Sequence, residues 1–501
     1  MSSLPVLQNY LSVITHLKLK EIYLVGGSVR DILLKRPLRD IDMALLSDSI
    51  DIARKFADRI AGSFFIMNEE EGVARVIKKD KRRIFQFDFA LFKGKDILED
   101  LSNRDLTINA MAISLQPLAL SLEPSTIIDP YNGRKDLKDK IVRIVKPNAF
   151  SDDPLRMLRA LRFASDLDFK IDDKTTEYIK SLSSSLKTVS SERVRDELFK
   201  IFKNTKSHYY ISLLDEYGLL DVVIPEIKDM KGLKQGSYHV YELWMHSLKS
   251  VEYLEHIIKD IKLYLPEYSD RIKRHLRLEI EQGIDRLSLL KFAALLHDTG
   301  KPSTLKKEGE KISFYQHWIV GAEINKGICR KLKMSAKSEE IVRRITESHM
   351  RPLYLTQLYY ENKAGLTRRA MYRFFRDADD SGIDVLLLSI ADAMATQPYA
   401  PASALPVPCL SADTGQTGAV SYKTVVAAVK RILDYYYTEY KMYRKKPLIS
   451  GSYLIKRFNL KPGPVIGRIL KDVEEQRGAG LLKDKSDAIN YIKENLRKWL
   501  E

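Results

Sequence analysis

Residues 23–42 read YLVGGSVRDILLKRPLRDID, and this stretch decides the fold of the N-terminal part of the chain. Its apolar start predicts a buried strand that breaks at Gly26 and Gly27. A helix is expected from about Ser28, and Pro37 closes it. Two glycines allow the backbone to come close to a ligand, and the free amides at a helix start favour phosphate. The stretch therefore predicts a phosphate-binding turn between a strand and a helix.

A second strand is expected from about Arg39. Because side chains alternate along a strand, Asp40 and Asp42 would point to one face while Ile41 points to the core. Two carboxylates on one face repel each other unless a cation lies between them. Mg²⁺ takes oxygen ligands, usually one or two carboxylates together with substrate phosphates. The sequence thus predicts a magnesium site close to the phosphate-binding turn.

The order of these features resembles the first motif of the nucleotidyltransferase superfamily, in its branch of bacterial class II tRNA nucleotidyltransferases and poly(A) polymerases. The resemblance is carried by residues 24–31, LVGGSVRD, followed by Asp40-x-Asp42. It implies that Asp40 and Asp42 hold Mg²⁺ for catalysis. It also implies that the triphosphate is bound by Arg30 and by the backbone amides of Gly26, Gly27 and Ser28.

Composition sets the class of protein. The chain has 501 residues, which is too long for one hydrophobic core, so about two to four domains are expected. The formal net charge is +16, which suits a polyanion-binding surface, although a basic protein with no special partner is the alternative. Cys329 and Cys409 are the only cysteines, which excludes a disulfide scaffold and a cysteine-rich zinc site. With no signal peptide pattern and no apolar run of membrane-spanning length, a cytoplasmic protein without membrane contact is expected.

Residues 1–145 mix short strand-like runs with helices and predict a small head with a mixed sheet. In the run over residues 83–89, three phenylalanines alternate with Gln86 and Asp88. Asp88 should therefore face away from the phenylalanines. It is either a third catalytic carboxylate beside Asp40 and Asp42 or an exposed strand residue.

Residues 100–112, DLSNRDLTINAMA, resemble the family's second motif, normally RRDFTINA. The resemblance implies that the ribose is held, and the site lined, by Arg104, Asp105 and Asn109. Asn103 stands where the family has its first arginine, which puts one contact in doubt. Residues 129–137, DPYNGRKDL, resemble the third motif, a hinge to which no catalytic residue is assigned.

Residues 151–163, SDDPLRMLRALRF, predict a helix with Asp152 or Asp153 as its cap and Pro154 at its first position. Asp153 and Arg156, three residues apart, can present a fixed acceptor and a fixed donor. Cytosine and adenine both offer an exocyclic amine beside a bare ring nitrogen, whereas uracil and guanine offer the reverse. A carboxylate beside a guanidinium would therefore accept C or A. A cap followed by a solvated arginine stripe is the alternative.

The same residues resemble the family's amino-acid template, Glu-Asp-x-x-Arg, with Asp152 in place of the glutamate. The resemblance implies nucleotide binding by Asp152, Asp153, Arg156 and Arg159. Poly(A) polymerases of this branch carry much the same string, so the motif does not settle which nucleotide is added. Residues 190–198 resemble the fifth motif and predict a capped helix that supports the template helix.

From about residue 205 the pattern is almost wholly helical. The stretches ALLHDTGKP, YQHW and ESHMRP resemble the HD phosphohydrolase superfamily. Imidazoles and carboxylates are the ligands of hydrolytic metal sites. The resemblance implies a divalent metal of unknown identity, with room for a second, held by His246, His297, Asp298, His317, His349 and Asp392. Core histidines, or a domain kept only as a scaffold, are the alternatives.

The C-terminal part begins with residues 397–422, rich in Pro, Ala and Ser, which predict a linker or insertion. The tyrosines between residues 435 and 443 suit single-stranded RNA or, equally, a helical core stripe. Residues 450–471 resemble the tail of these enzymes. There Lys461, Gly463 and Gly467 suggest a backbone approach to phosphate, such as that of the tRNA body.

The predicted fold is α+β: a nucleotidyltransferase head (1–145), an all-α neck with the nucleotide template (146–230), an HD-type body (231–396), a linker (397–422) and a helical RNA-binding tail (423–501). The predicted reaction adds C and/or A from CTP or ATP to the 3′ end of tRNA by two-metal nucleotidyl transfer. The segment between Asp88 and Arg104 is short. In the family, a short loop here accompanies enzymes that add only the two cytidines. A poly(A) polymerase and an HD phosphohydrolase are the alternative functions, and the oligomeric state is left open.

Overall fold

The computed structural model describes residues 21–38, 40–80, 83–115, 127–236, 239–309, 311–361, 366–396, 421–445 and 447–500, together with Tyr10, Leu17 and residues 12–14. The chain divides into two compact units. The first comprises Met1–Ile201 and Leu213–Val223, and the second comprises Phe202–Ser212 and Ile224–Glu501. The expected head and most of the neck fall in the first unit, and the expected body and tail fall in the second. The finer boundaries stay predictions.

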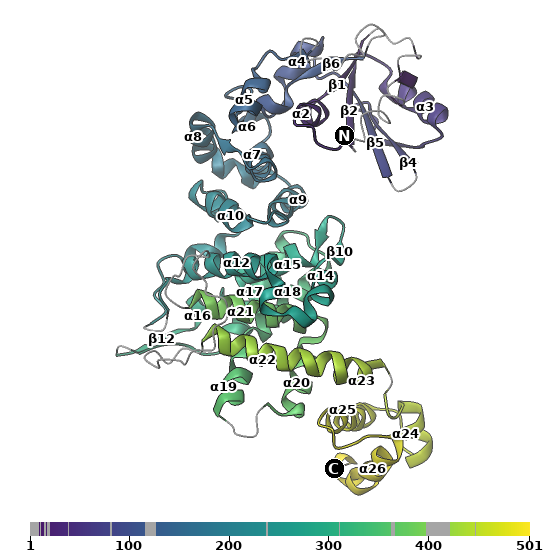
Figure 1. The fold of residues 1–501 in the computed structure, drawn as a ribbon, viewed down its shortest axis with the longest axis vertical. Helices are drawn as coiled ribbons and strands as arrows, with labels where there is room; N and C mark the ends of the chain where they lie inside the picture. The colour runs from purple at the N-terminus through teal and green to yellow at the C-terminus, as the bar shows by residue number, and fades with distance from the viewer. Residues whose placement is uncertain are drawn as a thin grey trace. The chain divides into compact units, whose positions relative to one another are not determined.

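The head is built on a mixed sheet, which confirms the predicted α+β class (Figure 1). Within the described residues the sheet has seven strands, in the order β3-β4-β5-β2-β1-β6-β7. Neighbouring strands are antiparallel except β2 and β5, which are parallel. The strands are β1 Ile22–Val25, β2 Asp40–Leu45, β3 Ser63–Asn68, β4 Val73–Asp80, β5 Arg83–Leu91, β6 Ala112–Ser114 and β7 Ile127–Ile128.

Strand register separates the apolar face of this sheet from its polar face. In the parallel pair of β2 and β5, Asp42 lies directly beside Asp88. The phenylalanines of β5 point the other way and are buried. The ring of Phe87 packs 5.0 Å from that of Phe56 on α3 (Ser49–Ile60). The alternation predicted from the sequence is therefore confirmed, and the carboxylates lie on the face opposite this core.

The carboxylate face of the sheet is covered at one end by α4 (Ile97–Ser102). This helix contributes to a buried apolar cluster made of Val25, Ala44, Ile97, Leu101 and Ala112. Next to it, α2 (Gly27–Leu33) follows the glycine turn after β1, close to the predicted helix start. The rest of this face lines a cavity.

The neck of the first unit is helical, as predicted. Its elements are α5 Gly133–Asp139, α6 Ala149–Asp152, α7 Leu155–Leu167, α8 Asp173–Leu182, α9 Ser191–Phe202, α10 Ser207–Glu216, α11 Leu220–Val223 and the short parallel pair β8 Ile141–Val142 with β9 Lys170–Ile171. Asp152 ends α6, whereas the Asp153 carboxylate accepts a hydrogen bond of 3.2 Å from the Leu155 amide. The predicted cap is therefore wrong: the N-cap of α7 is Pro154, which has no side-chain cap bond, and Asp153 lies just before it. Pro154 lies one residue before α7, a shift of one from the prediction.

The body in the second unit is helical apart from two short hairpins, β10 Glu279–Glu281 with β11 Ile284–Asp285, and β12 Leu305–Glu308 with β13 Lys311–Phe314. Its helices are α12 Leu243–Lys259, α13 Ile261–Tyr264, α14 Ser269–Leu276, α15 Arg286–Leu296, α16 Lys301–Thr304, α17 His317–Lys331, α18 Ala336–Ser348, α19 Arg351–Glu361, α20 Arg368–Ala378, α21 Gly382–Ala395, α22 Tyr422–Tyr435 and α23 Lys441–Lys445. Helices α12, α15, α18 and α21 pack against one another, and α17 packs on α18.

A buried ion pair fixes two of these helices. Arg286 on α15 donates two hydrogen bonds, of 2.6 and 2.9 Å, to Asp384 on α21. His275 Nε2 lies 3.1 Å from the other carboxylate oxygen. Burial would raise the pKa of Asp384, but His275 and Arg286 hold it below its usual value. Because both oxygens are satisfied, the charge is tolerated inside the bundle.

The tail forms its own apolar core. Helices α24 (Gly451–Phe458), α25 (Pro464–Gly478) and α26 (Lys485–Leu500) surround a cluster that includes Leu454 and Trp499. A Cβ built on Gly463 or Gly467 would meet no atom within 4 Å in the described structure, so both glycines are on open surface. A phosphate contact there, with Lys461, stays a prediction.

The tyrosines before the tail pack mainly inside the second unit. Tyr435 and Tyr440 are buried, and the Tyr435 hydroxyl donates to the Gly478 carbonyl at 2.9 Å. The ring of Tyr436 lies 4.6 Å from that of Phe375. Of the two interpretations of this stripe, the structure supports the core.

The predicted linker over residues 397–422 lies outside the described residues up to residue 420, as does Cys409, and α22 begins at Tyr422. Among the helices that are described, none has both the length and the apolarity needed to cross a membrane.

Gly133, in the motif predicted to be a hinge, packs too tightly for a side chain. A Cβ at this position would lie 2.3 Å from the Thr107 carbonyl oxygen. We expect Gly133→Ala to lower the free energy of unfolding of the first unit by about 1–3 kcal/mol, measured by urea and thermal unfolding. Gly467→Ala is the matched control: it should keep or raise stability, because alanine favours a helix interior. Equal unfolding midpoints for Gly133→Ala and the parent protein would contradict this packing.

Candidate active site and metal centre

The turn between β1 and α2 brings backbone, arginine and carboxylate together. Gly26 has φ +64°, and a Cβ there would lie 2.7 Å from Arg104 Nη1. A Cβ on Gly27 would lie 3.5 Å from Asp42 Oδ2. Glycine at these positions therefore leaves room for Arg104 and Asp42 to approach the backbone, as predicted for a phosphate-binding turn.

Ser28 has a structural contact in addition to the phosphate contact predicted for its backbone amide. Its side chain is fully buried and does not line the cavity. The hydroxyl accepts a hydrogen bond from the Asp42 amide at 2.8 Å and lies 3.3 Å from the Asp40 carbonyl, to which it donates. Ser28 thus fixes α2 to β2 at the height of the carboxylates. Nucleotide binding by Ser28 could involve only its backbone.

The carboxylates cluster on the cavity face. Asp40, Asp42 and Asp88 all line the cavity, so the structure brings Asp88 to the other two. Arg75 donates to both oxygens of Asp88, at 2.8 and 2.9 Å. Burial, and then the charge of Asp88, raise the pKa of Asp42 to about 6, against smaller lowering effects of Arg104 and Arg30. Negative charge therefore exceeds positive charge around Asp42, and a divalent cation would relieve the excess.

The second-motif residues form a connected polar network behind this cluster. Arg30 donates to Asn109 Oδ1 at 2.8 Å. Arg159 contacts the buried Asp105 carboxylate at 2.7 Å. Burial would raise the pKa of Asp105, but Arg159 and Asn109 lower it below its usual value. Arg104 is held by Asp100 through bonds of 3.0 and 2.9 Å.

An aromatic ring underlies several of these arginines. The guanidinium carbons of Arg30, Arg159 and Arg162 lie 5.0, 5.5 and 3.8 Å from the centre of the Phe163 ring. Arg162 also donates to Glu197 at 2.6 Å, which links α7 to α9. The predicted support of the template helix by α9 is thus confirmed. The site's cations are fixed by carboxylates and by cation–π contact before any ligand binds.

Most of these groups border one cavity of about 860 Å³ in the first unit, whereas Ser28 and Arg75 do not line it. Of the predicted head and neck site residues it is lined by Gly26, Gly27, Arg30, Asp40, Asp42, Asp88, Arg104, Asp105, Asn109, Asp153, Arg156 and Arg159. Asp152 does not line it, but lies 3.6 Å from Lys146 on the exposed side of α6. Its place at the end of α6 directs it away from the cavity, so the structure does not bring Asp152 to the site.

The cavity wall also contains Asn103, and it contains residues that the sequence alone did not single out: Lys93, Arg193, Asp196, Glu197 and Lys200. Asn103, the departure from the family's arginine, joins several segments. Its side chain donates to the Lys93 carbonyl at 2.6 Å and accepts from Lys146 at 3.0 Å. The one feature of the sequence that could have indicated the α9 residues is the density of charged side chains over residues 192–200.

The connection after β5 is short and closed by its own hydrogen bonds. Asp96 caps α4 by accepting from the Glu99 amide at 2.9 Å. The Lys93 amide donates to Asp100 at 2.9 Å, and the Lys95 amide donates to Glu99 at 3.0 Å. These bonds satisfy the backbone locally, so the segment forms a fixed wall of the cavity.

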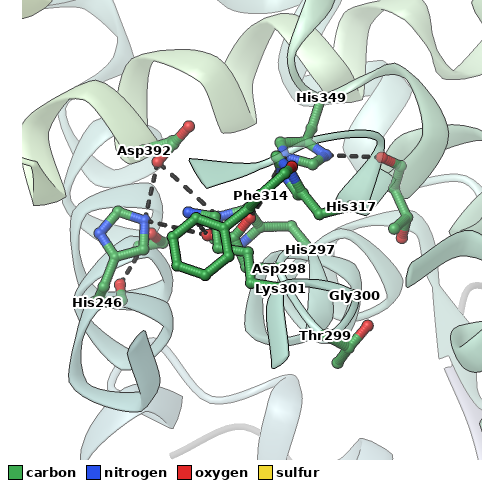
Figure 2. A network of polar contacts seen from close by, with 12 residues as sticks. His246, His297, Asp298, Thr299, Gly300, Lys301, Phe314, His317, His349 and Asp392 are labelled. Atoms are coloured by element: carbon green, nitrogen blue, oxygen red, sulfur yellow. Dashed lines mark hydrogen bonds and ion pairs between the residues drawn. The ribbon is translucent and has the colours of Figure 1, made fainter. Parts of the chain in front are cut away.

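A second site lies in the body, where helix ends meet (Figure 2). His246 lies on α12, Asp392 on α21 and His317 at the start of α17, while His297 and His349 follow α15 and α18. Asp298 is at the centre: its oxygens lie 3.2 Å from His297 Nε2 and 3.2 Å from His317 Nε2. All six predicted residues are therefore brought together.

The tautomers of three of these histidines are fixed by backbone carbonyls three residues earlier in the chain. The Nδ1 atoms of His297, His317 and His349 lie 2.8, 2.8 and 2.6 Å from the carbonyls of Ala294, Phe314 and Thr346. A ring that donates from Nδ1 presents the lone pair of Nε2 to the centre. This arrangement is typical of metal-ligating histidines.

The residues fit a divalent metal on their own chemistry. Within the described residues, two sets of ligand atoms lie within 4.8 Å of one another: His246, His297 and Asp298, and Asp298, His317 and His349. Both Asp298 oxygens and the Nε2 atoms of His246 and His297 are buried without a hydrogen bond of acceptable geometry. Asp392 Oδ1 lies 3.0 Å from His246 Nε2 and can complete the first set. A cation would satisfy these buried groups.

Two further groups lie beside the predicted six. Lys301 Nζ lies 2.6 Å from Asp298 Oδ2 and donates to Gln235 at 2.7 Å. The ring of His239 lies 5.3 Å from that of His246. Burial, and then Lys301, lower the pKa of His239 to about 4, so this histidine is neutral at neutral pH.

Comparison with known proteins agrees with both sites. Residues 22–143 match the poly A polymerase head domain, residues 168–231 match the probable RNA and SrmB-binding site of polymerase A, and residues 243–397 match the HD domain. The multifunctional CCA protein of Pseudomonas fluorescens is 31% identical over 340 residues, which cover 66% of this chain and 74% of that protein. The chain belongs to the tRNA nucleotidyltransferase and poly(A) polymerase family.

Other members of the family are also similar to this nucleotidyltransferase. The A-adding tRNA nucleotidyltransferase of Deinococcus radiodurans is 28% identical over 95% of both chains. The CC-adding tRNA nucleotidyltransferase of Geobacter sulfurreducens is 33% identical over 57% of this chain and 61% of its own. A solved CCA-adding enzyme in complex with ATP has the same fold, with a TM-score of 0.63 over 99% of this chain and 96% of its own, at 20% identity.

We expect Asp42→Asn to stabilise the folded protein at neutral pH. A carboxyl group whose folded pKa is raised destabilises the folded state as pH rises from the ordinary pKa of the group, 3.8, through about 6, because the unfolded state releases its proton first. The variant should therefore melt at a higher temperature than the parent at neutral pH without divalent ions, and this difference should vanish near pH 4. Asp51→Asn, at an exposed position on α3, should show no such pH-dependent gain. A lower melting temperature of Asp42→Asn at neutral pH would contradict a raised pKa of Asp42 in the folded protein.

Metal binding in the body can be counted directly. Asp298 belongs to both ligand sets, whereas His317 belongs to one. After equilibration with Mn²⁺ and dialysis, Asp298→Asn should lose all metal attributable to the body, and His317→Ala should lose only part, as measured by elemental analysis. His256→Ala, on the same helix as His246, should bind as the parent does. Full metal content in Asp298→Asn would rule out this ligand set.

Proposed function

We propose that the head transfers nucleotides from CTP and/or ATP to the 3′ end of tRNA. The observation that carries the proposal is the common cavity, in which Asp40 and Asp42 face the glycine turn while Asp153 and Arg156 line the same wall. In this reaction the terminal 3′-hydroxyl oxygen bonds to the α-phosphorus. The bond from that phosphorus to the pyrophosphate oxygen breaks, and the hydroxyl proton is released.

Different residues of the chain would carry out different parts of this reaction. Asp40 and Asp42 would hold Mg²⁺, which lowers the pKa of the attacking hydroxyl and neutralises the leaving pyrophosphate when bound. The Gly26 and Gly27 backbone and Arg30 would bind the triphosphate. Arg104, Asp105 and Asn109 would hold the ribose. No side-chain nucleophile is required, because positioning and charge neutralisation provide most of the catalysis.

Asp88 would act in support of the two metal-holding carboxylates. It lies beside Asp42 in register, and Arg75 already occupies both of its oxygens. Each oxygen keeps a lone pair, so Asp88 can still contribute to the cation. Its charge also raises the affinity of the site for positive charge.

The product can be one of three, since relatives are described as CCA-, CC- and A-adding enzymes. The closed, short connection between β5 and α4 supports the CC-only hypothesis. The A-adding relative, which is similar over almost the whole chain, supports the addition of A. A tRNA substrate, with the predicted tail as its further binding surface, would place the protein in the cytoplasm.

A second function is favoured by the body. Its six converging histidine and aspartate side chains would hold a divalent metal and support phosphohydrolase activity. The remaining alternative, a poly(A) polymerase acting on general RNA 3′ ends, shares the head and would be recognised by long A tails without a tRNA requirement.

The deciding experiment offers CTP and ATP separately to tRNA that lacks its 3′ end and to tRNA ending in C or CC. We expect incorporation onto at least one of these ends, and the pattern identifies the product. Incorporation of A onto a CC end would eliminate the CC-only hypothesis. Asp42→Ala should lose several orders of magnitude in turnover with little loss of fold. The Asp298→Asn variant should retain transfer, because its site is in the other unit. Near-normal transfer by Asp42→Ala would end the metal assignment.

A further inference from the structure

The base-reading carboxylate has a partner that the template motif does not contain. One oxygen of Asp153 accepts from the Leu155 amide at 3.2 Å, and the other accepts from Arg193 Nη2 at 2.8 Å. Arg193 lies on α9 and lines the same cavity. The carboxylate is thus held at both oxygens, from its own helix start and from a helix forty residues along the chain.

The base-reading guanidinium is held separately. Arg156 donates to the Asn103 carbonyl at 2.7 Å and to the Ala149 carbonyl at 3.3 Å. The structure shows no side-chain bond between Asp153 and Arg156 among these contacts. The predicted donor and acceptor are therefore fixed independently, each by its own partners, and are not held by each other.

From this arrangement we propose that Arg193 is a positioning residue for base selection: it orients the Asp153 carboxylate toward the exocyclic amine of the incoming nucleotide. This inference rests on the proposed nucleotidyl transfer. Each carboxylate oxygen has two lone pairs, so a bond to Arg193 leaves an acceptor free for the amine. Without Arg193, rotation about the last side-chain bond is limited only by the Leu155 amide.

Two other roles for Arg193 would have different consequences. The pair could merely tie α9 to the start of α7, and its loss would then weaken transfer of every nucleotide alike. Arg193 could instead contact the triphosphate, and its loss would again affect all nucleotides alike. Only a loss of acceptor orientation would weaken transfer of C and A, which offer an exocyclic amine beside a bare ring nitrogen, more than transfer of U and G.

Selectivity between nucleotides is therefore the quantity that distinguishes these roles. We define selectivity as kcat/KM for CTP divided by that for UTP, or kcat/KM for ATP divided by that for GTP. For Arg193→Ala we expect this ratio to fall about three- to tenfold. Most of the change should appear as a higher KM for the preferred nucleotide, because base pairing forms in the ground state. Arg193→Lys should restore part of the ratio. Arg195→Ala, which removes an arginine of the same helix that pairs with Asp196, should leave it unchanged.

A double-mutant cycle provides the second test. Because Arg193 is proposed to act through Asp153, Arg193→Ala should change selectivity little further in an Asp153→Asn background. An equal loss for all nucleotides, an unchanged ratio, or full additivity with Asp153→Asn would each overturn the proposal. Absence of transfer by the parent protein would instead overturn the proposed function, so the two failures are distinguishable.

Discussion

Crowding of negative charge on one face of the head sheet is the constraint on which the active site depends. The parallel register of β2 and β5 places Asp42 beside Asp88, with Asp40 on the same face. Burial, and then repulsion by Asp88, raise the pKa of Asp42 to about 6. The surroundings compensate for only part of this charge. Arg75 pairs with Asp88, and Gly26 leaves room for Arg104 to approach. The remaining attraction for a cation is what a metal-dependent transfer reaction requires.

The cations of the cavity show the complementary arrangement. Arg30, Arg104 and Arg159 each have a fixed acceptor, and the Phe163 ring lies beneath two of them. A guanidinium that is already oriented loses little freedom when a phosphate or base binds. The same holds for Asp153 and Arg156, which are held from α9 and from the end of α4. The head is therefore organised before its substrates arrive.

The body also holds its polar side chains in fixed positions, but it does so with backbone carbonyls. Its centre is assembled where helices end, because a helix end has free carbonyls that can fix the Nδ1 hydrogen of a histidine. His297 and His349 use such carbonyls, whereas His317 uses the carbonyl of Phe314 at the end of β13. Their Nε2 atoms then converge on Asp298, whose two oxygens serve two ligand sets. Helices α12, α17 and α21 and the ends of α15 and α18 thus bring together side chains that fit a divalent metal.

The sequence by itself determined the elements and the chemical groups. Alternation in residues 83–89 and 40–42 predicted which side of each strand carries a carboxylate, because a strand's period is local. The histidine and aspartate positions of the body were also readable as motifs. Only the tertiary structure decided which groups meet. The pairing of Asp42 with Asp88, the contact of Arg193 with Asp153 and the exclusion of Asp152 from the cavity all depend on how distant segments pack. No local pattern encodes such contacts, since they arise from the burial of separate apolar faces against each other.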